Sequence, residues 1–204
     1  MSTDDRRQLW QNTPEEMQQR PQWCVCGPEY DRGSPKRPFN PLVRRPASVT
    51  DPDSWVTFEQ AAQSGASNIG FVLSEDDPFF VVDLDTYKSQ VPDNHELILG
   101  AVETYVERSQ SGEGFHVIGM GSVGRGRNSR FHGIEIYDHD RFIIMTGNRI
   151  NQSGIAAAQP FADYIMELLG PIVDAEAQYY PPSRPSEEKD EALMARMAGS
   201  QNRS

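Results

Sequence analysis

The chain has 204 residues, 24% charged and 37% hydrophobic, and a formal net charge of −11, enough for one domain with a sizeable core plus tails. No apolar run approaches the ~20 residues of a membrane span, and the polar, acidic N-terminus is unlike a signal peptide. We therefore expect a soluble intracellular protein. The negative charge argues against a protein that coats nucleic acid through Lys/Arg–phosphate contacts, but not against an enzyme that binds nucleic acid locally and holds metal in an acidic cleft.

The first third of the chain alternates turn signals with short apolar segments. Residues 13–16 (Thr-Pro-Glu-Glu) predict the start of a capped helix with proline in its first turn. Residues 22–26 predict a short strand, and residues 27–46, rich in glycine, proline and basic side chains, predict a loop. A capped helix is predicted for residues 50–63.

The middle of the chain predicts a β-hairpin followed by a helix. Strands at 69–73 and 78–85 flank an Asp-Asp-Pro turn, and this short connection predicts that they pair with each other. Residues 94–108 carry apolar side chains at helical spacing, and residues 115–120 predict a further strand.

The last third predicts a second hairpin and an amphipathic helix. After a glycine–arginine loop at 121–130, strands at 133–137 and 141–146 flank an Asp-His-Asp turn. A helix is predicted for residues 160–169. Together these elements predict an α+β fold, with a mixed or antiparallel sheet and helices on one face.

One domain is predicted over residues 1–175, followed by a separate tail at 176–204. The tail begins with a Pro/Ser-rich sequence that is typical of a flexible linker. Residues 187–197 then predict the start of a further helix.

The cysteines and most histidines do not predict a zinc centre. Cys24 and Cys26 would lie on one face of a strand, which is poor geometry for a mutual disulfide, and further zinc ligands at suitable spacing are missing. We interpret both as small packed residues. His95, His132 and His139 lack a partner pattern and are interpreted as surface or turn residues.

Two carboxylates end the apolar run at residues 79–82. In a strand, residues two apart point to the same face, so Asp83 and Asp85 would project together, roughly 6.5–7 Å apart at the backbone. Such a pair can converge on two divalent ions held about 3.5–4 Å apart, the arrangement used for phosphoryl transfer. Without a cation, the two carboxylates would repel each other.

A second motif, Ser109-Gln110-Ser111-Gly112-Glu113-Gly114-Phe115-His116, follows after the predicted helix. Its glycines permit positive φ angles and close backbone approach, so amides and serine hydroxyls can turn toward a phosphate. His116 adds a donor that can be cationic near a polyphosphate.

A third motif, Ile-Glu-Ile-Tyr at 134–137, is followed by Arg-Phe and Thr-Gly. In this order the three motifs resemble the archaeo-eukaryotic primase superfamily, with the best match to the primase–polymerase branch of phages, plasmids and other mobile elements. The resemblance covers roughly residues 20–170 and implies an RRM-like primase–polymerase catalytic core.

The resemblance implies a two-metal site for Mg²⁺ or Mn²⁺. In this superfamily the first motif binds the catalytic metals, which maps to Asp83 and Asp85. The third ligand is an acidic residue on a later strand, which maps to Glu135 on the face away from the core. Asp138 is the alternative.

The second motif contacts the phosphates of the incoming nucleotide in this superfamily. The predicted nucleotide-binding residues are Ser109, Ser111, Gly112, Gly114, His116, Arg141, Arg127 and Lys36. Arg141 starts a strand whose opposite-phase residues, Phe142 and Ile144, are expected in the core. For Arg127 and Lys36, a solvated surface position is the alternative.

The leading interpretation is a DNA primase/DNA polymerase catalytic domain that performs metal-dependent, template-directed nucleotidyl transfer in replication of a phage or other mobile element. Expected partners are single-stranded DNA template, primer, dNTP or NTP, and a helicase domain or protein C-terminal to this region. The expected location is the cytoplasm of a prokaryote or virus-infected cell. A two-metal nuclease or phosphoesterase and a non-catalytic single-strand or origin-binding module stay open as alternatives.

Overall fold

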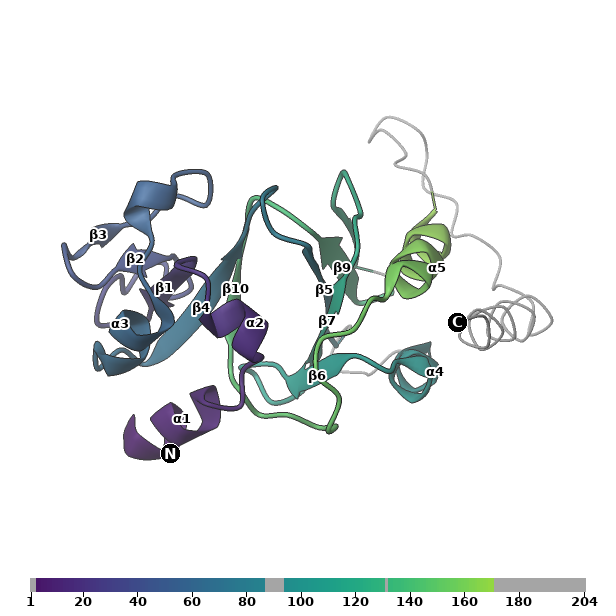
Figure 1. Cartoon of the computed structure of the whole chain (residues 1–204), viewed down its shortest axis with the longest axis horizontal. Coiled ribbons are helices and arrows are strands. Elements are labelled where there is room, and N and C mark those ends of the chain that lie inside the picture. Colours follow the sequence, from purple (N-terminus) through teal and green to yellow (C-terminus); the bar gives the residue numbers. More distant parts are fainter. Residues whose placement is uncertain (1–2, 87–93, 131, 171–204) are drawn as a thin grey trace.

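Two five-stranded antiparallel β-sheets form the body of the chain, with helices around them (Figure 1). The structure is a computed structural model that describes residues 3–86, 94–130 and 132–170. The α+β class with antiparallel pairing is therefore confirmed. The strands divide into two sheets, however, where the sequence predicted one.

The first sheet comes mostly from the N-terminal half and has the strand order β10-β4-β1-β2-β3. Its strands are β1 (Trp23–Cys26), β2 (Phe39–Asn40), β3 (Arg45–Pro46), β4 (Asn68–Leu73) and β10 (Arg141–Met145). The helical segments of this half are α1 (Thr3–Trp10), α2 (Glu15–Gln18), the 3₁₀ turn η1 (Pro52–Ser54) and α3 (Phe58–Gln63). Trp23 is fully buried, with the rings of Phe58 and Phe71 edge-on at 5.0 and 5.4 Å, so aromatic packing holds this half together.

The second sheet has the order β6-β7-β5-β9-β8, with β5 at its centre. Its strands are β5 (Phe79–Leu84), β6 (Tyr105–Arg108), β7 (Phe115–Met120), β8 (Arg127–Ser129) and β9 (Ile134–Tyr137), and its helices are α4 (Asn94–Ala101) and α5 (Gln159–Leu169). In β5, Phe80 and Val82 share a core with the helices, whereas Phe79 and Val81 share one with the first sheet. Because side chains alternate along a strand, Asp83 continues the row that faces the first sheet.

Neither predicted hairpin forms. β4 pairs with β1 and β10, whereas β5 pairs with β7 and β9, so the two strands belong to different sheets. In the same way β9 and β10 separate, one into each sheet. The turns lie where the sequence predicts them, but a turn motif does not determine which strand becomes the partner.

Asp77 fixes the turn at which the chain passes from one sheet to the other. Its carboxylate accepts hydrogen bonds from the backbone N–H of Ser74 (2.9 Å), the backbone N–H of Phe79 (2.9 Å) and the side-chain amide of Gln22 (2.8 Å). Burial raises the pKa of this carboxyl above its ordinary value, and the three donors oppose that rise. The turn thus connects the end of β4 to the start of β5 and to the segment before β1.

Two predicted helices are only partly right. The helix predicted for 50–63 divides into η1, capped by Asp51, and α3, capped by Thr57, because Val56 between them is extended and pairs with Trp23. A capping box of Thr57 and Gln60 then restarts the helix.

The helix predicted for 94–108 ends at Ala101, and residues 105–108 form β6. Tyr105 faces the core shared with the first sheet and Val106 the core shared with the helices, so strand alternation overrides the helical spacing.

Smaller differences complete the comparison. The helix predicted from residues 13–16 is the one-turn α2, with Pro14 rather than Thr13 at the N-cap, and α1 was not predicted. The predicted loops contain short strands, β2 and β3 in one and β8 in the other. The strands at 22–26 and 115–120 and the helix at 160–169 are confirmed to within a residue or so.

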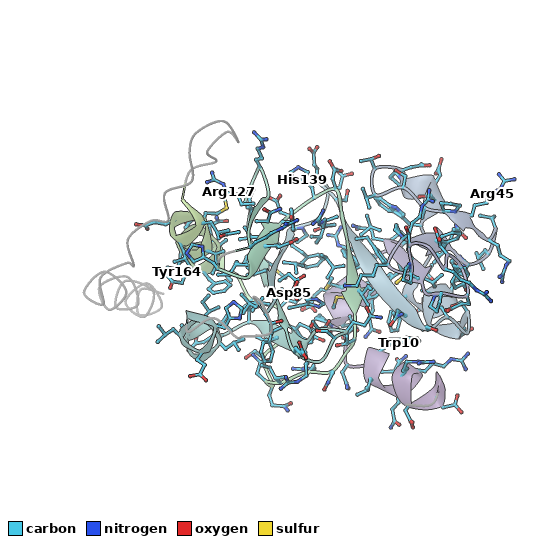
Figure 2. All side chains as sticks on the ribbon, turned by 180° about the vertical axis from the view of Figure 1, so that it is seen from behind. Trp10, Arg45, Asp85, Arg127, His139 and Tyr164 are labelled. Atoms are coloured by element: carbon cyan, nitrogen blue, oxygen red, sulfur yellow. The ribbon has the colours of Figure 1, made fainter. Side chains whose placement is uncertain are left out.

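The predicted linker and the helix at 187–197 lie outside the described residues. Within the described ranges, no helix combines the length and apolar character needed to cross a membrane. Figure 2 shows Asp85 near the middle of the molecule and Arg45 at the outer edge of the first sheet.

Replacing Asp77 by alanine should lower the free energy of unfolding by about 1–3 kcal/mol, because two backbone N–H groups and the Gln22 amide lose their acceptor. Urea unfolding measures the change. Asp76→Ala, at an exposed neighbouring position, is the control and should alter stability by less than about 0.5 kcal/mol. Equal effects of the two substitutions would contradict this assignment.

Candidate active site

A single row of side chains crosses the second sheet on the face toward the first sheet. The register places Asp83 of β5 directly opposite His116 of β7 on one side and Glu135 of β9 on the other. His116 is in turn opposite Glu107 of β6, and Glu135 is opposite Asn128 of β8. Directly opposite residues of antiparallel strands have Cβ atoms roughly 4.5–5.5 Å apart, so the row brings three carboxyl groups and one imidazole together.

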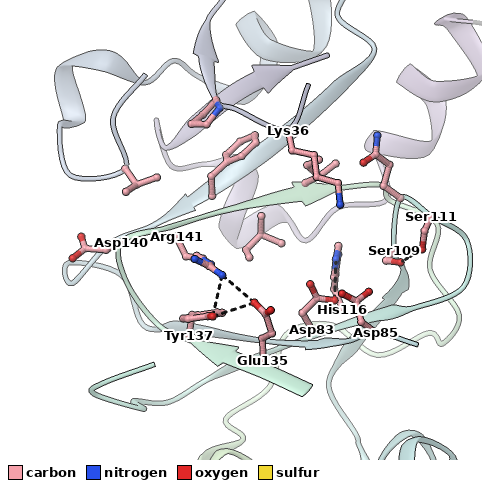
Figure 3. Close-up of a pocket in the computed structure, with 16 residues that line it drawn as sticks. Lys36, Asp83, Asp85, Ser109, Ser111, His116, Glu135, Tyr137, Asp140 and Arg141 are labelled. Carbon is pink, nitrogen blue, oxygen red and sulfur yellow. Dashed lines mark hydrogen bonds and ion pairs between the residues drawn. The ribbon is translucent and has the colours of Figure 1, made fainter. Parts of the chain in front are cut away.

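The row opens into a cavity of about 420 Å³ between the two sheets (Figure 3). Its walls come from both: β10 and the loop before β2 on one side, β5, β7 and β9 on the other. Eight residues predicted from the sequence line it: Lys36, Asp83, Asp85, Ser109, Ser111, His116, Glu135 and Arg141. Segments far apart in the chain therefore meet at one site.

Asp83 is the most perturbed acid of the site. Burial raises its pKa to about 6, and the negative charges of Asp85 and Glu135 add to the rise, while His116 and Lys36 oppose it. The Nε2 atom of His116 lies 3.8 Å from Asp83 Oδ1. An ionised Asp83 is thus costly here unless further positive charge lies close to it.

The residues present suit a hard divalent cation. Asp83 Oδ1 is buried and has no hydrogen-bond partner among the described residues, and it shares the cavity with Asp85 and Glu135. Carboxylate oxygens are the ligands that Mg²⁺ and Mn²⁺ prefer. In the described part of the chain, no three Asp, Glu, His or Cys side chains are already gathered closely enough to hold an ion. The donor chemistry therefore fits, but the side chains would have to converge.

Glu135 is paired with Arg141 and Tyr137. The Arg141 guanidinium donates to Glu135 Oε2 and to the Tyr137 hydroxyl, both at 2.9 Å, and that hydroxyl donates to Glu135 Oε2 at 3.0 Å. The guanidinium also lies 4.1 Å from the centre of the Tyr137 ring. Figure 3 shows these three side chains joined on one side of the cavity, with Asp83 and Asp85 beyond Glu135.

The predicted packing of β10 is wrong in phase. Ile143 and Met145 are the core residues, whereas Phe142 and Ile144 are half-buried. The cavity is lined by Arg141, Phe142, Ile143 and Ile144 alike. Every residue of the strand after Arg141 is apolar, so alternation could not distinguish its faces from sequence.

The serine–glycine motif forms the tight turn between β6 and β7, not the end of a helix. Ser109 and Ser111 lie with their hydroxyl oxygens 3.1 Å apart, and the N–H of Ser109 donates to the carbonyl of Gly114. Gly112 has a φ of +80°. A β-carbon at Gly114 would come within 3.1 Å of Asp85 Oδ1 and would meet the Leu84 carbonyl, so only glycine lets this turn approach the acids.

Glu107 is the site residue that the sequence did not reveal. It is fully buried, and its Oε1 accepts from His116 Nδ1 and the Thr146 N–H, both at 3.0 Å. Its Oε2 accepts from the Gly147 N–H at 2.8 Å and the Tyr105 hydroxyl at 2.9 Å. Because these oxygens act as acceptors, His116 carries its hydrogen on Nδ1 and turns Nε2 toward Asp83.

This hydrogen bond also affects the protonation of His116. Burial alone would lower the pKa of the ring, but the hydrogen bond and charge of Glu107, with Asp83 and Asp85, outweigh burial and raise it. The only sequence signal was an acid that follows two apolar residues and precedes Arg108, and that pattern is too common to single out Glu107.

Some predicted residues lie away from the cavity. The Arg127 guanidinium donates to the Gly170 carbonyl, and Figure 2 shows the side chain beside α5. Asp138, the alternative third ligand, accepts from the N–H groups of Val123 and Gly124 and serves a loop instead.

Cys24 and Cys26 are buried free thiols, which confirms their packing interpretation. The prediction that His95 is a surface or turn residue is wrong. This side chain is buried, and its Nε2 lies 3.0 Å from the His132 carbonyl oxygen.

The chain is 28% identical over 179 residues to a protein of Nitratiruptor phage NrS-1 named DNA primase-polymerase. The match takes in 76% of this chain and 24% of the phage protein, so the chain corresponds to about a quarter of that protein's length. No protein-family model matches the chain. The similarity supports a primase–polymerase type of domain, as the motifs predicted.

Replacing Glu107 by glutamine should destabilise the fold by about 1–3 kcal/mol, because an amide NH₂ cannot accept from the N–H groups it would face. ¹⁵N NMR of the histidine rings should show Nδ1 of His116 protonated in the parent chain, and in Glu107→Gln the pKa of the ring should fall because the carboxylate charge is removed. Glu113→Gln, exposed in the adjacent turn, is the matched control and should leave both unchanged. A neutral His116 ring protonated only at Nε2 in the parent chain would contradict the assigned hydrogen bond.

Proposed function

We propose that this chain is the catalytic domain of a DNA primase–polymerase, which joins nucleotides by metal-dependent, template-directed transfer. The observation that carries the proposal is the row in which His116, Asp83 and Glu135 are direct cross-strand neighbours at the edge of one cavity. The similarity to the phage primase-polymerase supports the same reading. Its substrates would be a single-stranded DNA template, a primer and nucleoside triphosphates.

Asp83, Asp85 and Glu135 are the residues proposed to hold two Mg²⁺ or Mn²⁺ ions. When bound, such ions lower the pKa of an attacking hydroxyl and neutralise the charge on a triphosphate and its leaving pyrophosphate. The burial and raised pKa of Asp83 support this role, since a divalent cation would favour the ionised carboxylate that burial disfavours.

The cationic side chains of the cavity are proposed to bind the triphosphate. His116 presents Nε2 toward Asp83, and Lys36 and Arg141 enter from the side of the first sheet. The hydroxyls of Ser109 and Ser111 add donors at the β6–β7 turn. These groups would orient the α-phosphate toward the 3′-hydroxyl of a primer, which attacks it and releases pyrophosphate.

Arg141 is proposed to change partners when substrate binds. It now pairs with Glu135, and at a side-chain exposure of 44% it is free to turn toward a phosphate oxygen. Its departure would release Glu135 to join Asp83 and Asp85. Metal and triphosphate binding would then be coupled through one ion pair.

The wider setting is part of the proposal. A helicase domain or protein following this region, and action in the cytoplasm of a prokaryote or a virus-infected cell, would suit a replication protein of a phage or other mobile element. The match covers 24% of the phage protein, so the rest of that protein is long enough to contain further domains.

The double substitution Asp83→Asn/Asp85→Asn should reduce primer extension on a single-stranded template by on the order of 10³-fold or more, because it removes the charge that metal ions would require. Extension with dNTPs or NTPs and Mg²⁺ or Mn²⁺, analysed by gel electrophoresis, measures the loss. Asp76→Asn, exposed in the turn before β5, is the matched control and should extend normally. Unchanged extension by the double variant would refute the site, and strand degradation without incorporation would favour a two-metal nuclease.

Metal binding can be tested without turnover. Mn²⁺ at about 100 times its dissociation constant should stabilise the chain by about 2.7 kcal/mol, raising the midpoint of thermal unfolding, and EDTA should reverse the shift. Asp83→Asn/Asp85→Asn should show no metal-dependent shift. An equal shift in that variant would place the ion elsewhere.

A further inference from the structure

A short region of this acidic chain is rich in positive charge. Residues 30–46, here called the basic hairpin, comprise β2, β3, the turn between them and the loop that precedes them. This region has five basic side chains and one acidic side chain, whereas the whole chain has 19 basic and 30 acidic residues. All five basic residues are exposed: Arg32, Lys36, Arg37, Arg44 and Arg45.

The charge of the basic hairpin is largely unneutralised. Asp31, its acid, accepts from the N–H groups of Gly33 and Ser34 and lies 3.8 Å from Arg37. Neither Arg44 nor Arg45 forms an ion pair within the described part of the chain. The Arg44 guanidinium instead stands 5.5 Å from the centre of the Tyr30 ring.

The tip of the basic hairpin exposes two large apolar side chains. Leu42 and Val43 are each 62% exposed, more than any other large apolar residue in the described ranges. The tip has a defined shape, because Asn40 Oδ1 accepts from the N–H groups of both residues and Arg44 has a φ of +53°. A turn held this way keeps two apolar side chains in solvent beside two arginines, which favours a partner with both apolar faces and negative charge.

The basic hairpin leads directly to the cavity. Lys36 and Pro38 belong to it and line the cavity wall, and Figure 3 shows the Lys36 ammonium above Asp83 and His116. From Pro38 the chain continues through β2 to the tip, and Figure 2 shows Arg45 at the outer edge of the same sheet. Basic side chains of this region thus lie both at the candidate active site (Lys36) and at the edge of the molecule (Arg45).

We propose that the basic hairpin binds single-stranded DNA, with Arg44 and Arg45 on the phosphates and Leu42 and Val43 against unstacked bases. The inference rests on the proposed function and deepens it by naming the surface that holds the template. Single-stranded nucleic acid combines a negative backbone with apolar base faces, the two features that this surface complements. Lys36 would be the last contact before the strand reaches the acids.

The test measures binding of a labelled single-stranded oligonucleotide to the full 204-residue chain by fluorescence anisotropy, in EDTA and without nucleotide, across a series of KCl concentrations. The charge variant is Arg44→Asn/Arg45→Gln, since asparagine tolerates the positive φ of Arg44. The apolar variant is Leu42→Ala/Val43→Ala. Arg125→Ala/Arg130→Ala, which removes two exposed arginines from another loop, is the matched control. Thermal unfolding checks that each variant is folded.

The two hairpin variants should weaken binding in different ways. Affinity falls as salt rises, and each phosphate contact to a single strand contributes about −0.7 to the slope of log affinity against log salt. The charge variant should therefore make this slope less negative by about 1.4. The apolar variant should weaken binding on the order of tenfold and keep the slope of the parent chain. The control variant should keep both slope and affinity.

An unchanged slope in the charge variant, or an equal fall in the control, would overturn the proposal. Unaltered DNA binding by both hairpin variants would likewise show that this surface does not hold the strand. The assay contains neither metal nor nucleotide, so a chain that binds DNA through the hairpin but never extends a primer would defeat only the proposed function. If both hairpin variants extend primers as well as the parent chain, only this inference would be refuted.

Discussion

The register of β5 between β7 and β9 is the constraint on which the candidate site depends. It sets His116 and Glu135 directly opposite Asp83, and it continues to Glu107 on β6. A shift of one residue in either pairing would turn the facing side chain to the helix side of the sheet. The alternation that buries Phe80 and Val82 under the helices is therefore what places Asp83 in the cavity.

The row has an uneven distribution of charge, and the surrounding structure compensates for it. At one end Glu107 is saturated by four donors and holds His116. At the other end Glu135 is paired with Arg141 from the first sheet. Asp83, between them, keeps a buried oxygen without a hydrogen-bond donor in the described residues and has a pKa raised to about 6. The centre of the row is thus the position that would gain most from a bound cation.

Local sequence was enough to predict most short elements and the cluster of acids, but not the arrangement of the sheets. The apolar strand that carries Asp83 and the Ser/Gly motif that ends with His116 could be recognised from sequence, and eight predicted residues meet in one cavity. The hairpins failed because strand partners are selected by long-range packing, which a turn such as Asp76-Asp77-Pro78 does not encode. Glu107 was missed because its role depends on hydrogen bonds from the N–H groups of Thr146 and Gly147, which lie about 40 residues away in the sequence.

The most direct test of the central claim is a crystal structure of the chain with Mn²⁺ and a nucleoside triphosphate, in which anomalous scattering locates the metal. The account predicts manganese peaks between Asp83, Asp85 and Glu135, with Arg141 turned from Glu135 toward the triphosphate. Manganese bound outside this row, with Glu135 still paired to Arg141 and the triphosphate in place, would contradict it.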